Sequence, residues 1–108
     1  MSDYVFLQSQ DPFTETQTLA QYQLIHNLAT KDNRVTLYLI QNGVMPARRG
    51  ALCKPFDLLC NQNINVVADR FSLEQRGIEL DQLKSGVNAE DIGVVIDAML
   101  RGDKVIWN

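Results

Sequence analysis

The sequence predicts a small three-layer α/β/α domain, with helices on both faces of a mostly parallel sheet of about five strands. Three observations support this prediction. Short apolar runs alternate along the chain with longer segments whose apolar residues recur at helical spacing. Helices rather than hairpin turns separate the strand-like runs, which implies right-handed crossovers and parallel pairing. The length of 108 residues suits one domain, spanning residues 1–108, with one modest core.

Short runs of apolar, branched and aromatic residues are expected to form the strands. Residues 4–8 are apolar enough for a buried strand, and residues 34–41 are rich in branched and aromatic side chains. Residues 64–68 form a third run of this kind. Two shorter runs, 84–87 and 104–107, complete the predicted sheet.

The first two helices are predicted from the residues at which they begin. Thr14 and Gln17 have the spacing of a capping box, in which each side chain satisfies an otherwise unpaired amide. The apolar residues that follow extend this helix to about residue 30. Pro55 suits the first turn of the next helix, which carries Phe56 and Leu59 on one face.

Two further helices are expected in the C-terminal half. Residues 70–76 form a short helix in this prediction, with Gly77 as its C-terminal cap. Asn88 is expected to cap the last helix at its start, and Gly102 to end it. The apolar residues at helical spacing in this last helix are Ile92, Val95, Ile96 and Met99.

A ligand site in such a sheet is expected beyond the carboxyl ends of the strands, among residues 41–54, 68–72 and 85–91. The loop after the first strand, "SQDPFTET", contains no glycine that would let the backbone approach a phosphate. Neither a Walker-type loop nor a dinucleotide fingerprint is present, so no nucleotide or flavin cofactor is expected.

Charge and composition exclude several other classes of protein. A net charge of -3 and a pI near 4.9 argue against a nucleic-acid surface. No apolar run reaches membrane-spanning length, and the N-terminus lacks the pattern of a signal peptide. Two cysteines are too few for a disulfide-built fold, which favours a cytoplasmic protein with reduced thiols. The lone histidine, His26, has no partners that would predict a metal site.

Three segments carry a resemblance to a known family. "LYLIQNGV", "VVADRFSLEQRGI" and "GVNAEDIGVVIDAMLRGDKVIWN" together resemble the DsrE/DsrF/TusD-like sulfur-relay family. The resemblance implies a small α/β domain that assembles into homo-oligomers, trimers or hexamers, or into hetero-oligomers with paralogues. It also implies that active members carry a persulfide on a cysteine that follows an alanine and precedes a short helix ending in Arg-Gly. Here Ala68 matches the alanine and Arg76-Gly77 the ending, whereas Asp69 stands in place of the cysteine.

Physical chemistry explains what this replacement changes. The N-terminus of a helix lowers the pKa of a thiol and favours the thiolate, which alone accepts and passes on a sulfane sulfur. An aspartate is stabilised by the same field and caps a helix well, but it cannot form a persulfide. We therefore expect Asp69 to be a helix cap and the chain to be a non-catalytic relative, a structural or regulatory subunit of a sulfur-relay-type oligomer.

Two alternatives remain open from the residues. Cys53 precedes a predicted helix and lies near Arg48 and Arg49, whose charges would depress its pKa, so it is a candidate sulfur-handling or redox thiol. Arg48 and Arg49, with Asn42 and Gly43, are also candidates for binding a small anion. Apolar residues of the same loop and of the C-terminus are candidate contacts between subunits: Val44, Met45, Leu52, Ile106 and Trp107.

Overall fold

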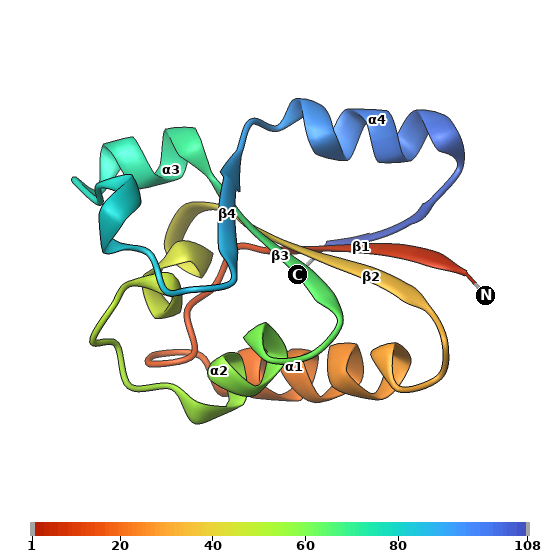
Figure 1. Cartoon of the computed structure of the whole chain (residues 1–108), viewed down its shortest axis with the longest axis horizontal. Helices are drawn as coiled ribbons and strands as arrows, with labels where there is room; N and C mark the ends of the chain where they lie inside the picture. Colours follow the sequence, from red (N-terminus) through yellow and green to blue (C-terminus); the bar gives the residue numbers. More distant parts are fainter. Residues whose placement is uncertain (1, 108) are drawn as a thin grey trace.

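The computed structural model describes residues 2–107 and has five parallel strands in one sheet, in the order β4-β3-β2-β1-β5. Helices cover both faces of this sheet, as the sequence predicts (Figure 1). The strands are β1 (Asp3–Gln8), β2 (Arg34–Leu39), β3 (Ile64–Asp69), β4 (Val87–Glu90) and β5 (Lys104–Trp107). The helices are α1 (Thr16–Ala29), α2 (Lys54–Cys60), α3 (Arg70–Gln75) and α4 (Gly93–Arg101), with 3-10 turns η1 (Gln41–Ala47) and η2 (Leu80–Gln82).

The two faces of the sheet carry separate hydrophobic clusters. Successive side chains of a strand point to opposite faces, so Phe6 of β1 packs toward α1 and α2, whereas Val5 and Leu7 pack toward α4. The α1 and α2 cluster is the larger one and includes the aromatic pair Tyr22 and Phe56, with ring centroids 5.9 Å apart. The α4 cluster consists of Val5, Leu7, Tyr38, Val67, Val95 and Ala98.

The predicted capping box at the start of the first helix is wrong. Helix α1 begins at Thr16, its N-cap residue is Glu15, and no side chain caps it. Thr14 instead donates its backbone N–H and its hydroxyl to Asp11 Oδ1, at 3.0 and 3.2 Å. An aspartate that accepts from backbone two or three residues further on makes a local turn, and this turn competes with the helix for the same residues.

The predicted start of the last helix is also wrong. Strand β4 spans Val87–Glu90 rather than 84–87, so Asn88 lies inside a strand opposite Val67. Helix α4 begins only at Gly93. Lys84 is held elsewhere, because its backbone N–H donates to Ala47 O at 2.8 Å beside the antiparallel bridge between Arg48 and Leu83. The segment therefore reaches the sheet three residues later than the apolar pattern suggests.

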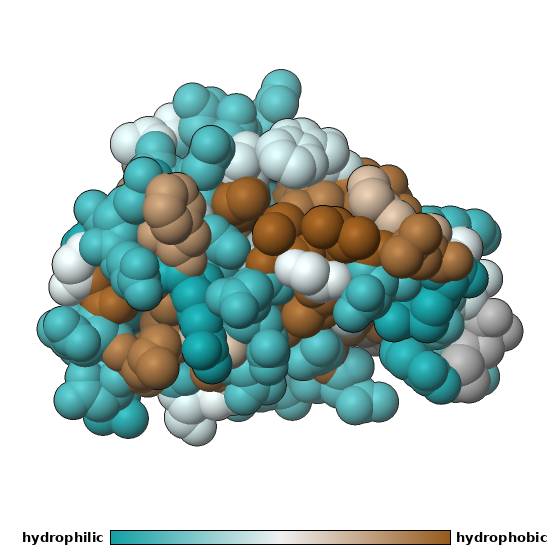
Figure 2. All heavy atoms as spheres, turned by 90° about the horizontal axis from the view of Figure 1, so that it is seen from above, coloured by the Kyte–Doolittle hydropathy of each residue, from teal (hydrophilic) through white to brown (hydrophobic). Residues whose placement is uncertain are grey.

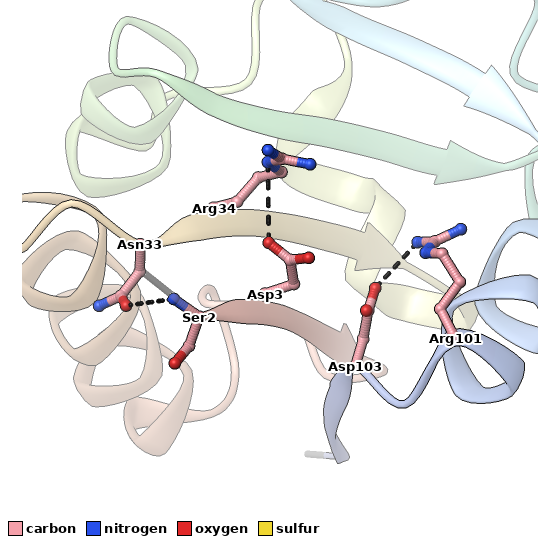
Figure 3. Close-up of polar contacts among 6 residues, drawn as sticks. All are labelled: Ser2, Asp3, Asn33, Arg34, Arg101 and Asp103. Atoms are coloured by element: carbon pink, nitrogen blue, oxygen red, sulfur yellow. Dashed lines mark hydrogen bonds and ion pairs between the residues drawn. The ribbon is translucent and has the colours of Figure 1, made fainter.

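Polar contacts join the amino ends of β1 and β2, and a separate ion pair lies just before β5 (Figure 3). Ser2 N donates to Asn33 Oδ1 at 3.2 Å, and Arg34 Nε lies 3.7 Å from Asp3 Oδ1. Across the connection from α4 to β5, Arg101 Nη2 lies 2.8 Å from Asp103 Oδ2.

In residues 2–107 no helix has the length and apolar character needed to cross a bilayer. The carboxyl edge of the sheet, at the opposite end, contains the candidate site.

Candidate functional site

Asp69 lies at the junction of β3 and α3, where the opening residues of a short helix follow directly on a buried strand. Its carboxylate accepts two hydrogen bonds from Ser72, from the backbone N–H at 3.0 Å and from the hydroxyl at 2.7 Å. Asp69 is therefore the N-cap of α3, and it is only 4% exposed. The predicted capping role is confirmed in this geometry.

Tyr38 of β2 supplies the third donor to this carboxylate. Its hydroxyl donates to Asp69 Oδ1 at 2.6 Å, and a longer contact of 3.4 Å joins it to Glu90 O. Burial raises the pKa of Tyr38, and the hydrogen bond to Asp69 raises it further, so the phenol keeps its proton and remains a donor. All three donors to the carboxylate come from the protein itself.

The loops after β2 and β3 meet through Ser72. Gln41 N, at the start of η1, donates to Ser72 Oγ at 2.8 Å, while Ser72 Oγ donates to Asp69. Two of the three segments predicted to hold a site, 41–54 and 68–72, are thus joined directly at the carboxyl edge. Sequence reasoning identified Asp69 but missed Tyr38 and Ser72. The spacing of Ser72 three residues after Asp69 is a detectable capping signal, whereas the pairing with Tyr38 depends on strand order.

Cys53 does not have the environment expected of a reactive thiol. It is the residue before α2 but is 7% exposed, and burial raises the pKa of its thiol. The backbone N–H of Phe56 and the ammonium of Lys84 lower this pKa, but burial is the largest effect and the net shift is upward. The expectation that Arg48 and Arg49 depress the pKa of Cys53 is therefore wrong. Desolvation outweighs the nearby positive charge.

Cys60 is a second poorly activated thiol. It lies at the end of α2 and is half-buried. Burial, with a smaller contribution from Asp57, raises its pKa to about 11. Both cysteines are free thiols. Neither is predominantly a thiolate near neutral pH.

Of the four residues predicted to bind an anion, the structure places Arg48 and Arg49 in one cavity and Asn42 and Gly43 outside its lining. Gly43 is buried against β1, where an added Cβ would lie 2.0 Å from Gln8 O, so this glycine permits close packing of η1. The amide oxygen of Asn42 accepts from Arg76 Nη2 at 3.0 Å. Arg48 and Arg49 line a cavity of about 660 Å³, together with Gly50, Ala51, Arg76, Gly77, Ile78, Asp81 and Gln82.

Arg76 is the one arginine of this cavity that the sequence did not predict to bind a ligand. It follows α3 and reaches back to the loop after β2, where Asn42 holds its guanidinium. Within residues 2–107, no three histidine, cysteine or acidic side chains lie close enough together to hold a metal ion. His26 lies apart from this edge on α1, with its Nδ1 2.8 Å from Gln62 Oε1.

Solved structures similar to this chain share its fold over almost their whole length. The ychN protein from E. coli is 20% identical with a TM-score of 0.89, and each chain is covered completely. MTH1491 from Methanobacterium thermoautotrophicum, a protein of unknown function, is 21% identical with a TM-score of 0.88, again over both complete chains. BT1422 from Bacteroides thetaiotaomicron, also of unknown function, is 13% identical with a TM-score of 0.75, covering 98% of this chain and 95% of its own.

Similarity at the level of sequence families defines the relationship further. No protein with a curated description matches the chain significantly. The family model of the DsrE/DsrF-like family matches residues 2–107, which includes every strand and helix of the fold and the β3 to α3 junction. The chain belongs to the DsrE/DsrF-like family.

Proposed function

We propose that this chain is a non-catalytic DsrE-like protein, a structural or regulatory subunit of a sulfur-relay-type oligomer in the cytoplasm. The observation that supports the proposal is the burial and hydrogen bonding of Asp69. At the position where active members of the family carry a cysteine, this chain has a buried carboxylate that accepts bonds from Tyr38 and Ser72. Its oxygens serve the fold rather than a substrate.

The chemistry of sulfur relay supports this proposal. Transfer of a sulfane sulfur requires a thiolate that attacks the donor and then holds the sulfur as a persulfide. A carboxylate has no sulfur atom on which a persulfide could form. The thiols that the chain does have, Cys53 and Cys60, have raised pKa values and restricted access to solvent. The alternative of a carrier thiol at Cys53 therefore lacks the activation that such chemistry requires.

Exposure to a sulfane-sulfur donor tests the proposal. The folded chain would be incubated with inorganic polysulfide, freed of excess reagent and weighed intact by mass spectrometry with and without a reductant. We expect no mass gain that the reductant reverses. The variant Asp69→Cys is the positive control, because the donors from Ser72 that stabilise the carboxylate would also stabilise a thiolate. A reversible gain of sulfur on the unsubstituted chain, mapped to Cys53 or Cys60, would overturn the proposal.

The surface of α4 supports assembly with another subunit. Only Val95 and Ala98 of this helix are buried against the sheet. Apolar side chains gather in a continuous band on the outer side of α4 (Figure 2). Trp107 of β5 is 64% exposed and lies on the same face, because Val105, two residues earlier, packs in the α4 cluster. The surface here called the α4 face consists of exposed apolar residues at and just before α4, together with Trp107 of β5: Ile92, Ile96, Met99, Leu100 and Trp107.

A contiguous exposed apolar surface usually marks an interaction site. The occupant we propose for the α4 face is a second DsrE-like subunit, another copy of this chain in a trimer or hexamer or a paralogue. Trp107 was already a candidate contact from the sequence. Val44, another such candidate, is fully buried in the core of its own subunit and is unsuitable as a contact. Leu52 is 90% exposed but lies outside the α4 face.

Sedimentation of the chain and of two charged variants tests this assembly. Leu100→Glu places a charge on the α4 face at a side chain that is 82% exposed, so the subunit itself should still fold. Leu58→Glu is the matched control on α2, on the opposite side of the sheet, at a leucine that is 62% exposed. We expect a trimer or hexamer that Leu100→Glu dissociates and Leu58→Glu leaves intact. A strictly monomeric chain at micromolar concentration, alone and with DsrE-like paralogues, would contradict the assembly.

A further inference from the structure

Three arginines from two separate segments line the cavity at the carboxyl edge: Arg48 and Arg49 after η1, and Arg76 after α3. The antiparallel bridge between Arg48 and Leu83 brings the loop after η1 beside η2. The backbone N–H of Arg49 donates to Gln82 O at 2.7 Å and fixes this contact. The turn at Gly77, which follows α3, places Arg76 along the same cavity. Backbone pairing therefore fixes the position of the loop that carries Arg48 and Arg49 beside η2.

Neutral acceptors hold all three guanidinium groups. Arg48 Nε donates to Met45 O at 2.8 Å, and Arg49 Nε donates to Leu83 O at 3.0 Å. Each bond fixes one side of its guanidinium and leaves the Nη groups with no hydrogen-bond acceptor among residues 2–107. Carbonyl oxygens orient a guanidinium without cancelling its charge.

Arg76 is the most firmly held of the three. Its Nε and Nη2 donate to Asn42 Oδ1 at 3.3 and 3.0 Å, and its Nη1 donates to Ser72 O at 3.2 Å. In the part of the chain that the structure describes, none of Arg48, Arg49 and Arg76 forms an ion pair. The cavity therefore has three oriented and unneutralised positive charges, in a chain whose net charge is -3.

The charge and size of the cavity define its ligand. Asp81 is the one acidic residue of the lining, beside three arginines. The net positive charge of the lining would therefore balance the charge of a bound dianion. Guanidinium groups bind phosphate and carboxylate oxygens through paired N–H donors. A volume of about 660 Å³ lies in the range of small-molecule sites, about 300–1,000 Å³, and exceeds what inorganic phosphate fills. Ala51 and Ile78 add half-buried apolar wall against which an organic group can pack.

We propose that this cavity binds the dianionic oxyanion group of a small organic molecule, such as a phosphate ester, through Arg48, Arg49 and Arg76. Inorganic phosphate presents the same oxyanion and is the alternative source of the ligand. The inference is independent of the missing carrier thiol and of assembly through the α4 face, because it depends only on the loops at the carboxyl edge.

Calorimetric titration and thermal unfolding at constant ionic strength test the site. The probes are ribose 5-phosphate, inorganic phosphate and ribose. We expect ribose 5-phosphate to bind and to raise the unfolding temperature, since a ligand of the native state stabilises it, and we expect ribose to do neither. A stronger effect of the ester indicates an organic ligand. An equal effect of inorganic phosphate indicates that the free oxyanion is the ligand.

Three variants make the test specific to the cavity. Arg49→Gln removes one donor and should weaken phosphate binding roughly tenfold, the effect of losing one charged hydrogen bond. Asp81→Asn removes the opposing charge and should tighten binding roughly two- to fivefold, a gain that no loss of folding can imitate. Arg70→Gln is the matched control, because Arg70 is an exposed arginine with one bond to a backbone carbonyl, at 3.4 Å, outside the cavity. Its affinity for phosphate should be unchanged.

Two results would overturn the proposal. The first is the absence of any phosphate-dependent heat or thermal shift at millimolar probe concentrations beyond the effect of chloride at the same ionic strength. The second is equal weakening by Arg70→Gln and Arg49→Gln, which would show attraction to the general surface charge. If Arg49→Gln does not fold, the sign of the Asp81→Asn effect decides.

Discussion

Replacement of Asp69 by alanine should strongly destabilise the fold, because Asp69 is the N-cap of the six-residue helix α3. The substitution removes the N-cap of α3, which costs about 0.5–2 kcal/mol. It also leaves the buried hydroxyl of Tyr38 with only the 3.4 Å contact to Glu90 O, and an unmade buried hydrogen bond costs about 1–3 kcal/mol. Together these effects predict a loss of about 1.5–5 kcal/mol in the free energy of unfolding.

Asp69→Asn should retain most of this stability. The amide oxygen of asparagine can accept both bonds from Ser72, and its NH₂ group can donate to the oxygen of Tyr38, whose hydroxyl can turn toward Glu90 O. Asparagine also caps helices about as well as aspartate. We expect a cost of less than about 1 kcal/mol. Asp69→Asn therefore separates the loss of charge from the loss of hydrogen bonds.

A double-mutant cycle with Tyr38→Phe isolates the second contribution. Once the hydroxyl of Tyr38 is absent, Asp69→Ala can lose only the cap, so its cost should fall to about 1 kcal/mol. Urea denaturation followed by circular dichroism, at one fixed protein concentration for all variants, gives the four free energies. Two outcomes would refute the reasoning: a cost for Asp69→Ala below about 0.5 kcal/mol, or costs that add with no coupling to Tyr38.

Three further predictions concern Tyr38, the two cysteines and Gly43. Burial raises the pKa of Tyr38, so the unfolded chain loses this proton at a lower pH than the folded chain does. The free energy of unfolding should therefore fall as the pH rises above about 10, and it should fall less steeply in Tyr38→Phe. Urea titrations of both proteins at several pH values would measure this difference. Iodoacetamide at pH 8 should modify Cys53 and Cys60 much more slowly in the folded than in the unfolded chain, measured by mass spectrometry, and equal rates would contradict their burial. Gly43→Ala should cost more than about 2 kcal/mol in urea denaturation, because its Cβ would lie 2.0 Å from Gln8 O; a cost below 1 kcal/mol would show that η1 can shift.

Those parts of the fold with strong local signals were predictable from the sequence. The strand at residues 104–107 and the end of α4 at Gly102 are confirmed, the latter by a left-handed φ of 86°. The first two strands and β3 are confirmed to within two residues. Strand β4 was placed three residues too early, because its position depends on pairing with β3, where Val66 lies opposite Val87. A four-residue strand has too few side chains to specify its own register.

The candidate site was predictable only in part, for a similar reason. Asp69 could be found because its neighbours in the sequence, Ala68 and Arg76-Gly77, carry the family pattern. Tyr38 could not be found, since it reaches Asp69 only through the adjacency of β2 and β3. The wrong expectation for Cys53 has a different origin. Charges near a residue can be counted along the sequence, whereas the desolvation that controls the pKa of this thiol depends on the packed core.

The three donors around Asp69 form a site that would stabilise a thiolate as well as a carboxylate. The hydroxyl of Tyr38, the backbone N–H of Ser72 and the hydroxyl of Ser72 converge on one buried position, at 2.6, 3.0 and 2.7 Å. Donors arranged in this way stabilise any anion, and a thiolate would gain the same electrostatic benefit as the carboxylate does. On the function proposed above, an aspartate in place of the family cysteine gives each of these buried donors an acceptor. If the proposed function is right, the role of the chain depends on the surfaces around this junction rather than on chemistry at Asp69.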